Sequence, residues 1–271
     1  MTAVQTDRVF AGAIPALYDR CLGPCLFAPY AAELAARLGG AASGTVLELA
    51  AGTGIVTRAL LRALPAAVRI VATDLNRAML DVAATRLSDG RVEWRQADAL
   101  RLSFAAERFA AVVCGFGAMF FPDRIAGYRE ALRVLRPGGP LVFTVWDRIA
   151  ENELADIVTD ALAALFPADP PRFLVRTPHG YHDPRTIRRE LREAGFAQVR
   201  IDALPRRSRA PSYRDPVIGL CQGTPLRGEI EARAPGRLDE VTEVAAAAVA
   251  ARFGTGPIDA KMSALLVEAR R

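Results

Sequence analysis

The stretch Val46–Leu60, VLELAAGTGIVTRAL, is the most informative part of the chain. Its apolar start predicts a short buried strand, and from Ile55 onward the apolar residues repeat with helical spacing. Gly52 and Gly54 stand between the two, where a side chain would block a ligand or strain the backbone. A strand, a glycine turn and a helix N-terminus aim free backbone N–H groups at whatever lies above the turn. In an open α/β sheet that place is the ligand crevice.

Two classes of nucleotide-binding enzyme use such a turn. Dinucleotide oxidoreductases have G-x-G-x-x-G, whose third glycine lets the helix pack close to the strand. Here Thr57 takes the third position, and the pattern reads Glu48-x-Ala50-x-Gly52-x-Gly54. This pattern resembles motif I of the class I S-adenosylmethionine (SAM) methyltransferases, with Ala50 in place of the family's usual first glycine. The resemblance implies a set of cofactor-binding residues in the turn, namely Glu48, Ala50, Gly52, Thr53 and Gly54. An ordinary strand–helix turn without a ligand is the alternative for this stretch alone.

An acid follows the next predicted strand, residues 68–73. Asp74 comes about 20 residues after Gly54, the interval at which a carboxylate reaches the ribose hydroxyls of a bound nucleotide. A carboxylate accepts hydrogen bonds from two neighbouring hydroxyls, so an acid suits this position. Leu75 is expected to lie on the adenine face. Asn76 is expected to cap the following helix, which leaves Asp74 free for the cofactor.

A third acid follows the strand predicted over residues 91–95. The segment Gln96-Ala97-Asp98-Ala99-Leu100 is similar to the methyltransferase segment whose Asp accepts from the adenine amino group. In that family the neighbouring backbone N–H donates to a ring nitrogen, so the resemblance assigns Asp98 and Ala99 to the cofactor. Dinucleotide enzymes have no special need for an acid here. Asp98 therefore favours a methyltransferase, and a surface-loop Asp is the alternative.

The strand predicted over residues 109–114 runs into Gly115-Phe116-Gly117. The end of a central strand is where the methionine part of SAM and the methyl acceptor should meet, so Cys114 and Gly115 are assigned to the cofactor. The two glycines permit close approach of the backbone. The residues after them, Met119, Phe120 and Phe121, offer an apolar floor.

The motifs from Val46 to Asp147 stand in the order expected of a class I methyltransferase. A helix over 124–135, an L-R-P-G-G run and a strand over 141–146 complete the set. The ordered set most resembles the ubiquinone/menaquinone-biosynthesis type (methyltransferase type 11/25), a broad group that methylates small molecules. The resemblance implies an α/β, Rossmann-like fold with a seven-stranded sheet of order 3-2-1-4-5-7-6, in which strand seven is antiparallel.

The rest of the chain departs from the common pattern. Helices are expected over 154–166, 185–194 and 238–253, with Asp183 capping the second, and the last two strands over 196–204 and 262–269. About fifty residues separate these strands, too many for a hairpin turn. We therefore expect an inserted helical lid over the active site. The expected domains are a helical cap over 1–44, a core over 45–205 with 148–182 partly in the lid, the lid insertion over 206–258, and a final core strand over 259–271.

The N-terminal helices, residues 7–38, are expected to pack across the open top of the sheet. Pro15 and Pro24 predict breaks within them, and Gly39-Gly40 predicts their end. Tyr18-Asp19 resembles a Tyr-Asp pair that lies near the cofactor in many small-molecule methyltransferases. A buried core tyrosine is the alternative for Tyr18.

No catalytic residue is fixed by the motifs. The sulfonium of SAM needs no activation, so the enzyme's task is to align the acceptor and exclude water. A general base is needed only if the acceptor loses a proton. His182 is the first candidate because histidine titrates near neutrality, followed by Tyr181 and Tyr18. Packing at the entry of the following helix is the alternative role for His182.

These motifs predict a SAM-dependent methyltransferase that acts on a small hydrophobic or aromatic acceptor at O, C or N, with S-adenosyl-L-homocysteine as product. An NAD-type oxidoreductase is the enzyme alternative, disfavoured by Thr57 and Asp98. The second alternative is a non-catalytic protein that binds SAM. It is disfavoured because the motif region departs from the methyltransferase pattern only at Ala50. Methylation of nucleic acid is disfavoured because no N/D-P-P-Y/F motif follows strand four.

Composition limits the remaining classes. The 271 residues, 51% of them apolar, suit one large domain or one and a half, and contain no run of about 20 apolar residues. No signal peptide is read, so we expect a cytoplasmic monomer or homodimer. The net charge is +5, and the chain has one basic cluster, formed by Arg206, Arg207, Arg209 and Arg214. We interpret this cluster as a solvated turn rather than a site that binds nucleic acid. Cys21-x3-Cys25 lacks a matching second pair, so no metal is expected.

Overall fold

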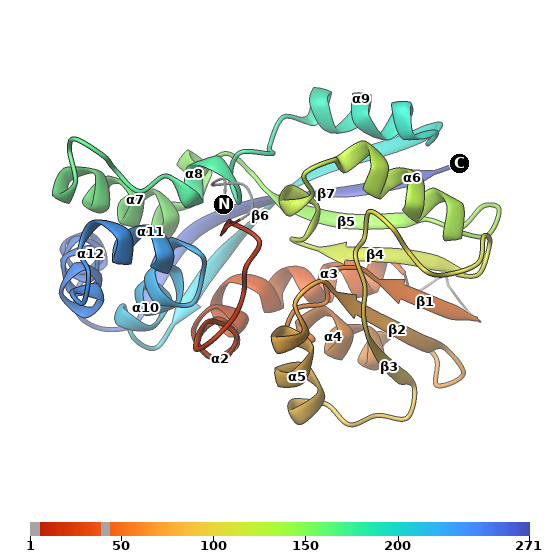
Figure 1. The fold of residues 1–271 in the computed structure, drawn as a ribbon, viewed down its shortest axis with the longest axis horizontal. Helices are drawn as coiled ribbons and strands as arrows, with labels where there is room; N and C mark the ends of the chain where they lie inside the picture. The colour runs from red at the N-terminus through yellow and green to blue at the C-terminus, as the bar shows by residue number, and fades with distance from the viewer. Residues whose placement is uncertain (1–5, 39–43) are drawn as a thin grey trace.

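A computed structural model describes residues 6–38 and 44–271, and these residues form one seven-stranded sheet (Figure 1). The strand order is β3-β2-β1-β4-β5-β7-β6, with β1 to β5 parallel and β7 antiparallel to both of its neighbours. The strands are β1 (Thr45–Glu48), β2 (Arg69–Asp74), β3 (Val92–Gln96), β4 (Ala111–Gly115), β5 (Leu141–Trp146), β6 (Gln198–Ala210) and β7 (Ile258–Arg270). The predicted fold class, strand order and antiparallel seventh strand are confirmed.

Helices cover both faces of the sheet, which explains why the central strands are apolar throughout. All six residues of β5 are buried, and so are the first four of β4. Helices α3 (Ala28–Arg37) and α4 (Ile55–Ala63) pack together on one face, and α6 (Arg124–Val134) and α9 (Pro184–Ala194) on the other (Figure 1). Helix α5 (Arg77–Arg86) packs against β2 and β3. The Asp183 side chain accepts from two backbone N–H groups of α9, so its predicted capping role is confirmed.

The N-terminal helices follow one another without interruption over residues 14–37, and we call this helical segment the rod. Helix α2 (Ile14–Leu17) leads into a ten-residue π-helix, Tyr18–Phe27, and then into α3. Pro15 lies in the first turn of α2, where a missing N–H costs nothing, and Pro24 lies inside the π-helix. The predicted breaks at these prolines are therefore wrong. The predicted stop at Gly39-Gly40 lies outside the described residues.

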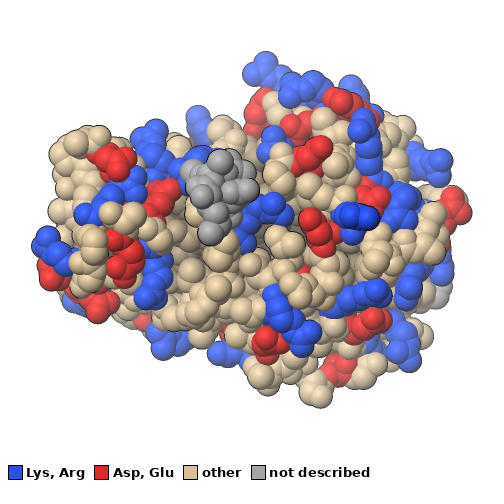
Figure 2. Space-filling model, in the orientation of Figure 1, with Lys and Arg blue, Asp and Glu red and all other residues tan. Residues whose placement is uncertain are grey.

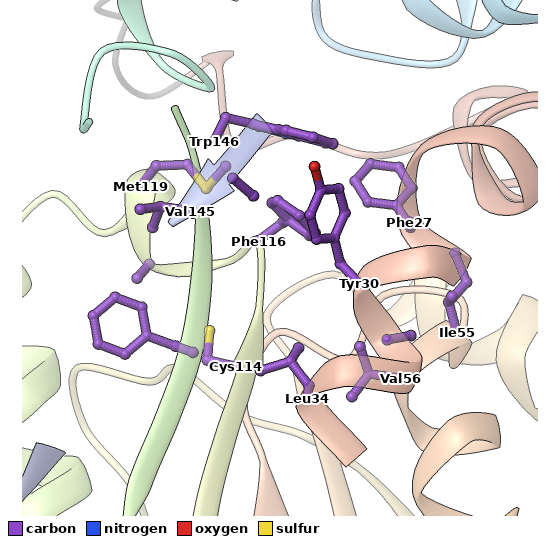
Figure 3. Packing of buried hydrophobic residues seen from close by; sticks show 14 of the residues in the cluster. Phe27, Tyr30, Leu34, Ile55, Val56, Cys114, Phe116, Met119, Val145 and Trp146 are labelled. Atoms are coloured by element: carbon purple, nitrogen blue, oxygen red, sulfur yellow. The ribbon is translucent and has the colours of Figure 1, made fainter. Parts of the chain in front are cut away.

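Aromatic side chains bind this rod to the open end of the sheet. Phe116, just after β4, stacks on Trp146 at the end of β5 with ring centroids 4.2 Å apart. Figure 3 shows Phe27 and Tyr30 pointing toward this pair from the N-terminal helices. The Tyr30 hydroxyl also donates to the Leu204 carbonyl at 3.2 Å. The rod is thus a fixed wall beside the carboxyl ends of β4 and β5.

The last two strands are much longer than predicted. They pair continuously from Gln198 with Arg270 to Ala210 with Ile258, so the expected strand ends at 204 and 262 are wrong. Pro205 does not end β6, because β6 lies at the edge of the sheet and needs no N–H there. The chain leaves this hairpin only between residues 211 and 257, so part of the range expected for the insertion belongs to the strands.

Five helices gather at the far end of this hairpin, beyond the parallel strands (Figure 1). We call them the roof helices: α7 (Glu153–Leu165), α8 (Phe173–Arg176), α10 (Arg214–Gln222), α11 (Leu226–Arg233) and α12 (Leu238–Phe253). The helices predicted over 154–166 and 238–253 are confirmed to within one residue.

Figure 2 shows basic and acidic side chains intermixed over the visible face rather than separated by sign. In the predicted basic cluster, Arg206 pairs with Glu33, and both Arg207 and Arg209 pair with Asp259. These three arginines lie in β6, so their assignment to a turn is wrong. No helix of the described ranges, 6–38 and 44–271, has the length and apolar character needed to cross a bilayer.

Candidate functional site

A cavity opens at the carboxyl ends of β1, β2 and β4, and we call it the sheet-end cavity. About 710 Å³ of empty space lies between its walls, open space at the mouth included. Seven residues predicted to bind the cofactor line it: Ala50, Gly52, Asp74, Leu75, Asp98, Ala99 and Gly115. Sequence positions spread over 65 residues thus meet at the crevice where parallel strand order reverses.

Asp74 connects the glycine turn with the end of β2. Its Oδ2 accepts from the Gly52 N–H at 2.9 Å, and its Oδ1 accepts from the Asn76 N–H at 2.7 Å. Burial raises the pKa of Asp74. A carboxylate offers about four lone pairs, and with the bond from the Asn76 side chain three of them are used, so one acceptor site remains for a hydroxyl group of a ligand.

Asn76 occupies the N-cap position of helix α5, as predicted, but its side chain makes no capping hydrogen bond. Its Nδ2 donates to Asp74 Oδ1 at 3.4 Å, and its Oδ1 accepts from the Phe10 N–H at 3.2 Å. Asn76 therefore supports Asp74 and holds the N-terminal segment at the mouth of the sheet-end cavity.

The glycine turn is built from left-handed residues. Ala50, Gly52 and Gly54 have φ of 51°, 56° and 79°. A Cβ on Gly54 would come within 2.9 Å of the Trp94 ring, so the close approach of β3 requires glycine there. This geometry gives the turn its sharp reversal into α4.

Four predicted cofactor residues are not among the described residues that line the sheet-end cavity: Glu48, Thr53, Gly54 and Cys114. Glu48 is buried beneath the turn, where its Oε2 accepts from Thr57 Oγ1 at 2.6 Å. Burial raises the pKa of Glu48 to about 8 and that of Cys114 to about 12. Thr57, which replaces the third glycine of the dinucleotide pattern, is thus committed to supporting the turn.

Asp98 lies in a tight turn after β3. Its Oδ1 accepts from the Leu100 N–H at 3.0 Å, and its carbonyl accepts from the Arg101 N–H at 3.0 Å. Within the part of the chain that the structure describes, Oδ2 has no hydrogen bond, which leaves it for a donor in the cavity.

A second cavity lies beside the first, and we call it the apolar cavity. Four residues line both cavities: Phe10, Tyr18, Phe116 and Phe120. Most of the other walls are apolar side chains from the rod, the sheet and the roof helices, including Leu26, Met119, Trp146, Leu154, Phe173, Leu220 and Met262. Of the predicted floor, Met119 and Phe120 line the apolar cavity, whereas Phe121 lines the sheet-end cavity.

His179 lies in the wall of the apolar cavity and was not a candidate from the sequence. Its Nδ1 lies 2.9 Å from the Asp147 carbonyl oxygen, which can only accept, so Nδ1 carries the proton. Nε2 is then an acceptor. Burial lowers the pKa of His179 to about 4, so the ring is neutral near pH 7. Gly180, whose added Cβ would lie 2.1 Å from the Arg176 carbonyl, marks the tight turn that presents this ring.

The sequence candidates His182 and Tyr181 are absent from the described residues that line the two cavities. His182 Nδ1 lies 2.7 Å from the His179 carbonyl oxygen. The Tyr181 hydroxyl donates to Glu190 Oε2 at 2.6 Å and meets the Tyr128 hydroxyl at 3.1 Å. Both residues fix the segment that carries His179.

Tyr18, the third candidate, does lie between the two cavities. Burial raises its pKa above the usual value, so it remains a phenol. Asp19 points elsewhere, toward Arg58 at 3.5 Å and Arg86 at 3.1 Å. The structure therefore separates the predicted Tyr-Asp pair.

In the segment 7–10, which we call the strap, Arg8 and Phe10 line the sheet-end cavity and Phe10 also lines the apolar cavity. Asp7 is buried, pairs with Arg176 of α8 at 2.7 Å and accepts from Thr177. Arg176 also pairs with Glu229 of α11 at 2.6 Å. The strap is thus tied to the roof helices at one end and, through Phe10 and Asn76, to β2 at the other.

Comparison with known proteins finds methyltransferases among the relatives of this chain. The profile of the family described as "Methyltransferase domain" matches residues 46–139. A ubiquinone/menaquinone biosynthesis C-methyltransferase of Pseudomonas putida is 32% identical over 177 residues, which are 60% of this chain and 69% of that protein. The corresponding protein of Pseudomonas aeruginosa is 31% identical over 176 residues, with 60% and 69% of the two chains covered.

Solved structures share the fold at low identity. Phosphoethanolamine N-methyltransferase 2 of Haemonchus contortus, in complex with phosphomonomethylethanolamine and S-adenosylhomocysteine, has a TM-score of 0.59 at 15% identity, over 94% of this chain and 56% of that one. The YcgJ protein of Bacillus subtilis has a TM-score of 0.56 at 16% identity, over 90% and 99% of the two chains.

Proposed function

Because this chain belongs to the class I SAM-dependent methyltransferases, we propose that its sheet-end cavity holds SAM and that its apolar cavity holds the methyl acceptor. The observation that carries this assignment is the wall of four aromatic residues that the cavities share. One side of this wall has carboxylates, Asp74 and Asp98, and the other side is apolar. A polar nucleoside and an apolar acceptor would thus meet across one layer of side chains.

The residues of the sheet-end cavity fit SAM chemically. Asp74 retains an acceptor site for a ribose hydroxyl, and Asp98 Oδ2 suits an amino donor. Leu75 and Met79 supply apolar surface for a purine ring. The positions of Glu48 and Thr57 disfavour the NAD alternative, because Thr57 bonds to the buried acid instead of letting the helix approach a pyrophosphate.

The acceptor is an apolar or aromatic small molecule, on this proposal. The named activity of the Pseudomonas relatives, C-methylation in ubiquinone/menaquinone biosynthesis, supports a ring-containing acceptor. The lining by Phe116, Trp146 and Phe173 supports it independently, since aromatic walls favour flat apolar ligands.

His179 is the group that takes the acceptor's proton. When bound, SAM supplies a methyl group on a sulfonium, and transfer to an O–H, C–H or N–H acceptor yields the methylated product, S-adenosyl-L-homocysteine and a proton. Nε2 of His179, a residue of the apolar cavity wall, has no hydrogen bond among the described residues and is left to accept a proton, and the Asp147 carbonyl fixes the tautomer of the ring. The apolar walls exclude water, and the strap contributes Phe10 to the walls of both cavities.

We also propose a cytoplasmic monomer or homodimer that does not act on nucleic acid. Four free, buried cysteines support a reducing compartment. The carboxylate partners of Arg206, Arg207 and Arg209 leave little free positive charge for phosphates. Light scattering of the purified protein and a filter-binding assay with RNA and DNA test these points.

Calorimetric titration with SAM, S-adenosylhomocysteine and NAD tests the cofactor assignment, and transfer of labelled methyl groups to a panel of small molecules tests the acceptor class. We expect the two sulfur nucleotides to bind and NAD not to bind. We expect aromatic phenols or quinols to be methylated in preference to charged metabolites. A panel in which only charged metabolites accept the methyl group would contradict the acceptor proposal.

A further inference from the structure

Ser208, a residue of the wall of the apolar cavity, carries a buried hydroxyl group without a hydrogen bond among the described residues. It stands on β6 opposite Ala260 of β7. Its neighbours Arg207 and Arg209 point outward to Asp259, so the alternation of the strand turns Ser208 inward. Ser208 is 1% exposed, and its Oγ has no hydrogen-bond partner in the described part of the chain.

The neighbouring polar groups do not satisfy this hydroxyl. The Cys25 thiol donates to the Cys21 carbonyl at 3.1 Å, and its sulfur is at most a weak acceptor for the Ser208 hydroxyl. Asn152 and Thr224, which line the same cavity, are both engaged: Asn152 Oδ1 accepts from Ser263 N–H, and Thr224 Oγ1 donates to the Leu220 carbonyl. A buried hydroxyl without a partner is unfavourable, so a ligand group is the natural partner for Ser208.

Other buried hydroxyls without partners do not meet a cavity. Thr53 and Thr144 share this property with Ser208 among the described residues, but neither lines the sheet-end or the apolar cavity. The orphan hydroxyl of Ser208 is therefore distinguished by its place in the wall of the apolar cavity.

Ser208 is remote from His179 along the sheet. The His179 ring bonds to the Asp147 carbonyl. The Asp147 N–H in turn donates to the Ser263 carbonyl, so Asp147 lies opposite Ser263 of β7. Ser208 lies level with Ala260, three residues further along β7, which is about 10 Å at the rise of a β-strand. Ser208 also does not belong to the described lining of the sheet-end cavity, in contrast to the four shared aromatic residues.

We propose that Ser208 is a distal subsite that hydrogen-bonds a hydroxyl or carbonyl oxygen of the acceptor at the end opposite to the methylated atom. The acceptor is then an elongated aromatic molecule with an oxygen-bearing group at each end and an apolar middle. This proposal rests on the proposed function, because it takes the apolar cavity to be the acceptor site.

A matched pair of probes tests the distal subsite. Para,para-biphenol has a hydroxyl at each end of two linked rings, and para-phenylphenol lacks the second one. Their affinities are measured by calorimetry with S-adenosylhomocysteine at saturation, and their kcat and KM by transfer of labelled methyl groups. We expect the wild-type protein to bind the biphenol about five to ten times more tightly, the value of one hydrogen bond.

The control variant is Thr144→Val, which removes an orphan hydroxyl outside both cavities. Ser208→Ala should abolish the preference for the biphenol by raising its KM and leaving kcat for the phenylphenol unchanged. Thr144→Val and Ser208→Thr should keep the preference. Ser208→Ala should also leave the melting temperature of the free protein unchanged or higher, because no hydrogen bond of the fold is lost.

Each other result has a separate meaning. Equal affinity of the wild-type protein for the two probes, or a preference that survives Ser208→Ala, overturns the distal subsite. Binding of S-adenosylhomocysteine without binding of either probe overturns it as well, and leaves the cofactor assignment standing. Failure of S-adenosylhomocysteine to bind overturns the proposed function itself.

Discussion

The methyl group of Ala50 fills the space beside Gly117. A Cβ on Gly117 would lie 2.4 Å from the Ala50 Cβ and 2.8 Å from the Cys114 sulfur. Ala50 has a left-handed backbone, with φ of 51°, which costs a residue with a Cβ roughly 1–2 kcal/mol. The loop after β4 thus accommodates the side chain that this chain carries where its family usually has glycine.

The contact predicts coupling between the two positions. Gly117→Ala should lower the free energy of unfolding by about 1–3 kcal/mol, because the added methyl group overpacks the turn. In an Ala50→Gly background the same change should cost less, by about 1 kcal/mol or more. Urea denaturation of the four proteins measures this coupling, and strictly additive effects would contradict the contact.

Asp74 and Glu48 should respond differently to loss of charge. Asp74→Asn should weaken SAM binding about tenfold or more, because a hydroxyl acceptor in the sheet-end cavity becomes a donor. Glu48→Gln should change SAM affinity by about twofold or less, because Glu48 is buried behind the turn and its oxygen still accepts from Thr57. Calorimetry on both variants measures the difference. A larger loss for Glu48→Gln than for Asp74→Asn would place the ligand elsewhere.

The buried Glu48 should make stability depend on pH. Its folded pKa of about 8 lies above the ordinary value of 4.5, so between these pH values the native state holds a proton that the unfolded state releases. Its contribution to stability is therefore present below pH 4.5 and is lost as pH rises toward 8. Glu48→Gln should flatten the fall of melting temperature across this range. Parallel curves for the variant and the wild-type protein would show that Glu48 ionises freely.

His179 should be required for turnover, and His182 should not. His179→Gln should lower kcat about 100-fold or more for an acceptor that must lose a proton, with SAM affinity unchanged. His182→Gln is the matched control, since it changes the same side chain three residues away and outside the cavities. Equal losses in the two variants would mean that the segment, rather than the His179 ring, matters.

The pH profile gives a second test of His179. Its folded pKa of about 4 lies below the ordinary 6.5, so the neutral ring persists to low pH and kcat should fall only as pH approaches 4. Between pH 6.5 and 4 the unfolded state binds the extra proton, so the stability from the neutral ring is lost as pH falls. A break in kcat near pH 6.5 would show that the ring is exposed to water during turnover.

The ion pairs of the strap should control release of the nucleotide. Arg176→Met leaves Asp7 buried without its cation and frees the strap from α8 and α11. We expect S-adenosylhomocysteine to dissociate several times faster, as followed by tryptophan fluorescence. Arg214→Met, which breaks an exposed pair with Glu243, is the control and should leave the rate unchanged. Equal rates in all three proteins would exclude the strap as a barrier.

The predictable parts of the fold are those whose interacting residues are close together in the sequence. The strand, turn and helix around Gly52 and Gly54 are adjacent in the chain, and the spacing to Asp74 reflects one strand–helix–strand unit. Once these units follow one another in a known family order, the sheet order follows as well. The sheet-end cavity was therefore largely predictable, since seven of its residues come from strand ends.

His179 could not be chosen over His182 from the sequence. The contact that separates them, Nδ1 with the Asp147 carbonyl, spans 32 residues, and the two histidines share almost the same local surroundings. The ends of β6 and β7 were misplaced for a different reason. Proline and a series of arginines suggest a turn, yet both are well suited to an exposed edge strand, where they discourage pairing with other chains.

The long β6–β7 hairpin also determines where segments of this enzyme can be exchanged with those of a related protein. The same two strands close the sheet and carry Ser208, Lys261 and Met262 into the apolar cavity, so the roof is not an exchangeable module that begins where the common fold ends. A chimera cut at 205 and 259 would sever paired backbone and detach part of the wall of the apolar cavity. Cuts at 211 and 257 would transfer the roof helices and keep the β6 and β7 strands of the recipient protein. The cavity residues on those strands would then be the recipient's, and they would limit any change in acceptor preference.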